Sequence, residues 1–428
     1  MKLELPRGLR DIEPEEFDKI EWLREKYVET LRLFGFNIME PSPIENLSTL
    51  ERKSGSSIVN EIYFFKDKAA RELGLRFDLT VGISRFVSSR RDLEFPMKIG
   101  AFSGVWRYDE PQHGRYRWFY QWDAEIYGRP CVEADAEIID LATAFFEKTG
   151  LKDIQVELSD RKVVEEYITD IVGMGEEEKV SELLRMLDKT SKKSEEEIIQ
   201  EYSAKGFSEG KLREVLSIAK VNGKPGDALG ELEKMGLKKL DDLRDIVQEL
   251  ETRGISGFRI NLGIVRGIDY YSGIVYEFYD TSLGRLAVAG GGRYDKLMQA
   301  FGRPDLSATG MAGGVERMVM AIEHNKKIER TIRQRVFVAY AKEELKQKAQ
   351  EITAKIRKRG YTTETDIYSR ELRKQLAYAS KHCNYVIIIA PKEDMEGFFI
   401  LKNLKSGEEQ KIAYNKILEN KEGKLFLE

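Results

Sequence analysis

The sequence of 428 residues has few of the side chains that build covalent or metal-bound frameworks: two cysteines, three histidines and 10 prolines. Cys131 and Cys383 lie far apart, and the histidine positions do not match zinc-ligand spacing, so neither a disulfide scaffold nor a structural zinc site is expected. No apolar run approaches the roughly 18 residues that a transmembrane helix needs. The first residues lack a basic-then-apolar signal pattern, which predicts a cytoplasmic protein with no membrane partner.

The composition is that of a folded globular protein of several domains. Hydrophobic residues make up 41% of the chain and charged residues 34%, and domains of about 150 residues would give two or three of them. The formal net charge is −4, yet residues 331–428 contain 20 Lys and Arg against 14 Asp and Glu. This asymmetry favours a carboxyl-terminal domain that meets an anion, although an ordinary solvated surface would have the same composition.

Four segments follow from the hydrophobic pattern. Residues 1–160 start with an amphipathic helix from Pro14 to Phe34 and continue with two long strands between 98 and 127 and a helix to 148. Residues 161–253 read as a Lys- and Glu-rich helical insertion, folded on itself. Residues 254–325 resume with a hairpin over 273–289 and a helix from Gly314. Residues 331–428 alternate strands and helices, which predicts a small α/β domain with a largely parallel sheet.

The strand from Arg117 to Gly128 has the densest functional signal. Side chains alternate between the two faces of a strand, so Gln121, Asp123 and Glu125 share one face while Trp118 and Trp122 share the other. A polar row in a central strand predicts a bound polar ligand. The alternative is a solvated outer face of an antiparallel sheet.

Two further patterns could hold phosphate. Arg107 ends the partner strand, and the following loop contains Glu110, His113, Arg115 and Arg117, which could grip a phosphate chain through guanidinium contacts. Gly313-Gly314-Val315-Glu316-Arg317 leads into a helix whose free N–H groups favour negative charge. A glycine-led helix start is also a common cap.

Two glycine-rich segments each have a structural and a functional interpretation. Residues 266–273 place an Arg–Asp pair and two tyrosines between glycines, which fits a binding loop or an ordinary turn with an ion pair. Residues 290–295, Gly-Gly-Gly-Arg-Tyr-Asp, fit either a tight turn or a backbone that approaches a ligand closely.

At these motifs the sequence resembles the histidyl-tRNA synthetases, in particular their archaeal-type branch. Residues 106–117, followed by Phe119, Gln121 and Glu125, resemble motif 2 of class II synthetases; residues 266–271 resemble the histidine-specific signature, and 313–317 resemble motif 3. The resemblance implies an α+β fold: a class II antiparallel sheet flanked by helices, with a helical insertion and a carboxyl-terminal α/β anticodon-binding domain.

The resemblance also implies roles for individual residues. Arg107 and Arg266 would act in catalysis, facing each other across the histidine carboxylate and the ATP α-phosphate. ATP would further contact Glu110, Arg115 and Arg317. Histidine would be bound by a larger set of side chains: Asp78, Thr80, Gln121, Glu125, Arg266, Tyr270, Tyr271 and Tyr294. Mg²⁺ would accompany ATP, with no protein ligand assigned to it.

The implied activity is ligation of L-histidine to histidine tRNA through a histidyl-adenylate, by a homodimer that contacts the acceptor stem and the anticodon. The region from Phe36 to Pro43 resembles the motif 1 dimer element. Asp78 stands where bacterial members usually have Glu, and Gly82 where many have proline. The alternatives are a regulatory subunit of ATP phosphoribosyltransferase, disfavoured because Arg107, Arg266, Arg317 and residues 331–428 are present, and a class II enzyme for another amino acid.

Overall fold

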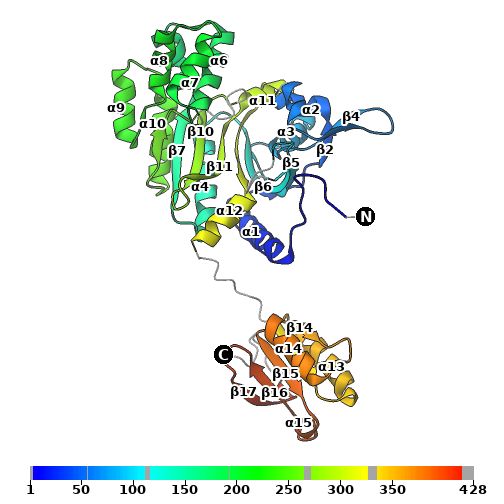
Figure 1. Cartoon of the computed structure of the whole chain (residues 1–428). Helices are drawn as coiled ribbons and strands as arrows, with labels where there is room; N and C mark the ends of the chain where they lie inside the picture. The colour runs from blue at the N-terminus through cyan, green and yellow to red at the C-terminus, as the bar shows by residue number, and fades with distance from the viewer. Residues whose placement is uncertain are drawn as a thin grey trace. The chain divides into compact units, whose positions relative to one another are not determined.

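The computed structural model describes residues 3–54, 56–110, 116–191, 193–264, 271–325 and 335–416. The chain divides into two compact units, Met1–Ile328 and Glu329–Glu428 (Figure 1). Within the described ranges, no helix is both long enough and apolar enough to cross a bilayer.

The first unit is built on a nine-stranded sheet that is mostly antiparallel (Figure 1). Within this sheet, only β1 with β5 and β7 with β9 pair in parallel among its described strands. The strand order is β1 (Asn37–Ile38), β5 (Met97–Trp106), β6 (Trp118–Gly128), β12 (Ser307–Gly314), β11 (Leu286–Arg293), β10 (Ile274–Asp280), β7 (Ile154–Asp160), β9 (Arg259–Asn261) and β8 (Asn222–Gly223). The long strand pair and the hairpin expected from the sequence are both confirmed.

One face of this sheet packs against α1 (Pro14–Leu33), α4 (Val132–Lys148) and α12 (Val315–His324). Helix α1 begins at a proline with Glu15 and Glu16 in its first turn, and Gly35 follows it with φ +72°, as helix ends require. The apolar side of this helix faces the sheet, and its residues Leu23 and Tyr27 are buried. Phe17 in the first turn of this helix is 42% exposed.

The opposite face of the sheet is covered by α2 (Leu47–Ser54), α3 (Thr80–Ser89) and α11 (Asp295–Ala300). A small sheet lies beside these helices, with the order β2 (Ile44–Asn46), β4 (Glu72–Leu75) and β3 (Phe64–Lys66). Leu79 and Ile83 pack there on Ala101 and Tyr127 of the large sheet. Helix α3 therefore covers the face of β6 that bears the polar side chains.

Residues 161–253 are largely helical, as expected. The helices are α5 (Arg161–Glu166), α6 (Glu177–Asp188), α7 (Glu195–Ser203), α8 (Glu209–Ile218), α9 (Pro225–Lys234) and α10 (Asp241–Thr252), with a π-turn at Tyr167–Ile171. They do not pack only on one another: Ile246 and Leu250 of α10 belong to the same core as α4, and β8 joins the large sheet.

The second unit is a five-stranded sheet with the order β14 (Thr362–Thr365), β13 (Arg335–Tyr340), β15 (Tyr385–Ile389), β16 (Phe398–Asn403) and β17 (Glu409–Ala413). Its helices are α13 (Lys346–Arg357), α14 (Leu372–His382) and α15 (Pro391–Met395). The first three strands in this order are parallel, as predicted, whereas β16 and β17 add an antiparallel edge that the alternation did not predict.

Candidate active site

The polar row of β6 is buried. Gln121 is 4% exposed, and Asp123 and Glu125 are fully buried. The interpretation of this face as a solvated surface is therefore wrong, because α3 covers it. Buried carboxyl and amide groups need hydrogen-bond partners, so the row indicates a site rather than a surface.

A cavity of about 120 Å³ lies in front of this row. It brings together many of the residues expected to bind histidine, from four separate parts of the chain. Its lining is Lys53, Asp78, Thr80, Arg107, Gln121, Glu125, Tyr271, Gly290, Tyr294, Gly310, Met311 and Ala312. We call this space the smaller cavity.

Glu125 is held by a chain of hydroxyl groups behind the smaller cavity. The Tyr294 hydroxyl donates to Glu125 Oε2 at 2.5 Å and contacts the Tyr127 hydroxyl, which lies 3.0 Å from that of Ser84. Burial, followed by the charge of Asp123, raises the pKa of Glu125 well above its usual value. The carboxyl group is thus fixed in position and is costly to ionise in this environment.

Lys53 is a charged residue of this cavity that the sequence analysis missed. Its ammonium donates to Asp78 Oδ2 at 2.7 Å, and both side chains are almost completely buried. The nearby carboxylates of Asp78 and Glu125 and the Tyr271 hydroxyl all favour the charged lysine, so its pKa is raised although burial alone would lower it. Asp78 therefore enters the site as one half of a buried ion pair.

Three oxygens of the β6 row have no hydrogen-bond partner among the described residues: Gln121 Oε1, Asp123 Oδ1 and Glu125 Oε1. Buried acceptors left without a donor are costly. Gln121 and Glu125 line the smaller cavity, so their free oxygens favour a ligand that has several N–H groups.

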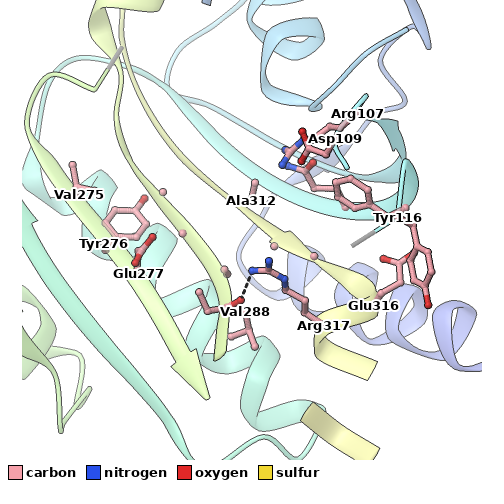
Figure 2. Close-up of a pocket in the computed structure, with 18 of the residues that line it drawn as sticks. Arg107, Asp109, Tyr116, Val275, Tyr276, Glu277, Val288, Ala312, Glu316 and Arg317 are labelled. Carbon is pink, nitrogen blue, oxygen red and sulfur yellow. Dashed lines mark hydrogen bonds between the residues drawn. The ribbon is translucent and has the colours of Figure 1, made fainter. Parts of the chain in front are cut away.

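A second space of about 330 Å³, the larger cavity, adjoins the smaller one. The two share Arg107, Gln121, Tyr271, Gly290 and Ala312 in their linings. Figure 2 shows the larger cavity, with Arg107 and Arg317 reaching it from different elements and Ala312 on the strand between them.

Both arginines of the larger cavity are held by main-chain carbonyls. Arg107 Nε donates to the Phe77 carbonyl at 3.0 Å, and its guanidinium lies 5.2 Å from the centre of the Phe119 ring. Arg317 Nη1 donates to the Ala287 carbonyl at 2.9 Å, as drawn in Figure 2. Two positive groups therefore lie along one cavity, which suits a chain of phosphates.

Glu316 fixes the start of α12 beside Arg317. Its two carboxylate oxygens accept the Tyr120 N–H at 3.0 and 3.2 Å, and Arg10 lies 3.8 Å away. Burial raises the pKa of Glu316 to about 7. This contact ties the glycine-led helix start to β6 and so positions Arg317.

Other sequence-predicted residues lie elsewhere. Glu110 is exposed, pairs with Arg7 at 3.1 Å and is not among the described residues that line either cavity. Arg115, Arg266, Tyr270 and His113 lie outside the described residues. Arg117 does not reach a cavity lining: it is 7% exposed and donates to the carbonyls of Asp109 and Arg7.

The glycines at 290–292 belong to strand β11 rather than to a turn. A β-carbon on Gly291 would lie 2.1 Å from the Gly310 carbonyl oxygen, so close packing on β12 explains this glycine. Gly290 lines both cavities, in agreement with the alternative interpretation that the backbone there approaches a ligand.

Comparison with known proteins gives the family. Residues 8–318 match the family model described as histidyl-tRNA synthetase, and residues 335–420 match the one described as anticodon binding domain. The chain is 33% identical over 432 residues to the histidine–tRNA ligase of Pyrococcus horikoshii, covering 97% of this chain and 98% of that protein. It is 34% identical to that of Pyrobaculum islandicum, covering 94% of each chain.

Solved structures share the fold. The histidyl-tRNA synthetase of Nostoc sp. superposes with a TM-score of 0.82 at 23% identity, covering 98% of this chain and 99% of that one. A Bacillus halodurans protein described as an ATP phosphoribosyltransferase regulatory subunit/histidyl-tRNA synthetase gives 0.76 at 24% identity, covering 91% and 99%. The family models and the archaeal relatives together show that the chain belongs to the histidyl-tRNA synthetase family.

Proposed function

We propose that this chain ligates L-histidine to histidine tRNA in two steps. In the first, a histidine carboxylate oxygen bonds to the ATP α-phosphorus as the bond from that phosphorus to the bridging oxygen breaks, and pyrophosphate leaves. In the second, the terminal ribose hydroxyl of the tRNA attacks the acyl carbon and loses its proton to solvent, and AMP leaves.

The proposal rests on the position of Arg107, which lines both cavities. A histidine in the smaller cavity and an ATP in the larger one would place the carboxylate and the α-phosphate on either side of this guanidinium. Arg107 would then bind both reactants and stabilise the negative charge that develops at phosphorus. Arg266 would act from the opposite side, as the family resemblance implies.

The smaller cavity suits histidine because its free acceptors match the substrate's donors. The α-ammonium brings three N–H groups, which Asp78, Thr80 and Gln121 would accept. The imidazole would meet Glu125 and the hydroxyls of Tyr271 and Tyr294, with Tyr270 from the same signature nearby. An apolar amino acid would leave Gln121 Oε1 and Glu125 Oε1 without a donor, so binding would discriminate strongly against it.

The larger cavity suits ATP. Its phosphates would contact Arg107, Arg317 and, from the motif 2 loop, Glu110 and Arg115, while Phe119 offers a flat ring to the purine. Mg²⁺ would neutralise part of the phosphate charge. The described residues contain no group of three metal-ligating side chains, so phosphate oxygens and water would supply most ligands, as is common for Mg²⁺.

Residues 331–428 would bind the anticodon, and residues 161–253 would form a helical insertion domain that contacts the acceptor stem. The catalytic domain would then comprise residues 1–160 and 254–325. The basic excess of residues 331–428 supports binding to a polyanion.

We also propose a homodimer assembled through the edge of the large sheet. Apolar side chains are exposed near this edge and on the neighbouring small sheet: Ile38 (45%), Ile44 (42%) and Phe64 (53%). Sheet edges and exposed apolar patches are usually covered by a partner. Light scattering of the purified chain would give twice the monomer mass.

Charging of a histidine tRNA transcript with labelled histidine tests the proposed function. We expect acid-stable labelling of the tRNA that requires ATP and fails with transcripts for other amino acids. The Arg107→Ala variant should lose charging, while the matched Arg129→Ala variant, changed outside both linings, should retain it. A protein that binds histidine but charges no tRNA would instead fit a regulatory paralogue.

A further inference from the structure

Asp123 is a buried carboxyl group in the polar row that the reaction described above does not use. It lies on β6 between Gln121 and Glu125 on the same face, with no exposed surface. The Thr80 hydroxyl donates to Asp123 Oδ2 at 3.3 Å, whereas Oδ1 has no partner in the described part of the chain. Asp123 is absent from the described lining of the smaller cavity, to which Thr80 belongs. It therefore lies directly behind Thr80.

The charges around Asp123 are incompletely balanced. Its in-register neighbours on β5 and β12 are Ala101 and Ala312, which are uncharged. Charged and titratable groups face it from four other places: Asp78 before α3, Lys53 on α2, Arg107 after β5, and Tyr27 on α1, whose hydroxyl donates to the Asp123 carbonyl at 2.5 Å. Glu125 adds a further carboxyl on β6 itself.

Lys53 is already engaged by another carboxylate. Asp78 Oδ2 accepts the Lys53 ammonium at 2.7 Å, and Asp78 Oδ1 accepts the Val81 N–H at 3.1 Å. The charge of Asp78 is therefore largely offset before any ligand binds. No described cation lies in ion-pair contact with Asp123, so an ionised Asp123 would add negative charge beside the cavity that no described ion pair offsets, next to the carboxyl group of Glu125.

We propose that Asp123 is a positioning residue for the substrate's α-ammonium: its carboxylate supplies the balancing negative charge and turns the Thr80 hydroxyl so that the oxygen lone pairs face the ligand. This rests on the proposed function, because histidine is taken as the occupant of the smaller cavity. The Thr80 hydroxyl donates to Asp123 Oδ2, with Glu125 as a second acceptor nearby, and its oxygen lone pairs can accept from an ammonium. Asp123 thus acts through Thr80 and through its field, without touching the substrate.

The proposed role also requires the Asp123 carboxyl group to lose its proton when the substrate binds. Burial, with Asp78 second, raises the pKa of Asp123 to about 8, so this environment favours the protonated carboxyl group at neutral pH. An ammonium in the cavity favours the carboxylate and lowers that pKa. Histidine binding at pH 7 therefore releases the Asp123 proton to the buffer, and histidine affinity rises with pH up to about 8, as long as the substrate amine stays charged.

Calorimetric titration of the full-length Asp123→Asn variant tests the inference with three ligands: histidine, histidinol, and imidazolepropionate, which lacks the amine. The variant should lose the carboxylate charge and weaken the bond between Thr80 and the ammonium. A hydrogen bond to a charged group is worth enough for a loss of about 10- to 100-fold in affinity for the two amines. The affinity for imidazolepropionate should change much less. Equal weakening of all three ligands, or unchanged histidine affinity, would overturn the proposal.

Proton release gives a second readout, and its main measurement is made on the unmodified protein. In the unmodified protein at pH 7, the observed binding heat for histidine should vary with the ionisation enthalpy of the buffer, whereas the heat for imidazolepropionate should not. Absence of this dependence, or its persistence in Asp123→Asn, would overturn the inference. If the unmodified protein binds no histidine at all, the proposed function itself fails, which is a distinguishable result.

Discussion

The Tyr294 hydroxyl donates a 2.5 Å hydrogen bond to Glu125 Oε2, and this contact fixes the carboxyl group at the end of the smaller cavity. Tyr294 follows β11 directly and Glu125 lies on β6, so the contact crosses the intervening strand β12. It can form because the residue on β12 paired with Glu125 is Gly310. The geometry of the pocket thus depends on one missing side chain.

Gly310→Ala should disable histidine binding. The added β-carbon would lie 1.4 Å from Glu125 Oε2 and 2.8 Å from the Ala124 carbonyl oxygen, so the carboxyl group must leave its position. Displacement of a binding group by about 1 Å can cost 100-fold, and we expect a rise of that order in the KM for histidine during activation.

Gly230→Ala is the matched control for that substitution. Gly230 lies within α9 with no neighbouring atom within 4 Å of an added β-carbon, and alanine favours helix over glycine by about 0.5–1 kcal/mol. Its KM for histidine should be unchanged and its thermal midpoint equal or slightly higher. A normal KM in Gly310→Ala would remove Glu125 from the histidine pocket.

Lys53→Met should destabilise the first unit. Removing one partner of a buried ion pair leaves an uncompensated charge and typically costs about 3–5 kcal/mol, here at Asp78. Thermal unfolding followed by calorimetry should show a lowered midpoint. The control is Lys179→Met, which breaks an exposed 2.7 Å pair with Glu176 and should leave the midpoint almost unchanged. Equal midpoints for both variants would contradict the buried pairing.

Asp160→Asn tests the pH dependence of stability. Asp160 caps α5 by accepting the Lys162 N–H at 2.8 Å, and burial raises its pKa to about 7. The unfolded chain has an ordinary value of about 3.9, so the native state binds this proton more tightly. The stability contribution of Asp160 is therefore lost as pH rises from about 4 to about 7.

Asparagine can accept the same capping bond without titrating. The thermal midpoint of the variant minus that of the unmodified protein should therefore rise between pH 4 and pH 7 and then level off. Midpoints measured at half-unit intervals would show this. A difference that stays constant across the range would mean that Asp160 titrates normally.

Deletion of residues 331–428 should separate the two steps of the reaction. Both cavities lie in the first unit, so adenylate formation should survive, whereas loss of one of two tRNA contacts should lower kcat/KM for tRNA by about 100-fold. Pyrophosphate exchange and tRNA charging measure the two steps. An equal loss of both would assign the second unit a structural role.

Much of the fold was predictable because individual helices and strands leave local patterns of apolar and polar residues in the sequence. Alternation along β6 predicted which side chains share a face, and the residues after Pro14 predicted α1. Lys53 was missed because Glu51-Arg52-Lys53 looks like a solvated helix end, and only the packing of α2 buries it. Gly310 was missed because its role depends on its register with Glu125, which no local pattern contains.

We propose that histidine and ATP react where the two adjoining cavities meet. Pyrophosphate exchange into ATP, measured with each of the 20 amino acids and without tRNA, is the sharpest test because activation alone is observed. We expect exchange that depends on histidine and on none of the other amino acids. Exchange with a different amino acid, or none with histidine under conditions where calorimetry shows that histidine binds, would contradict it.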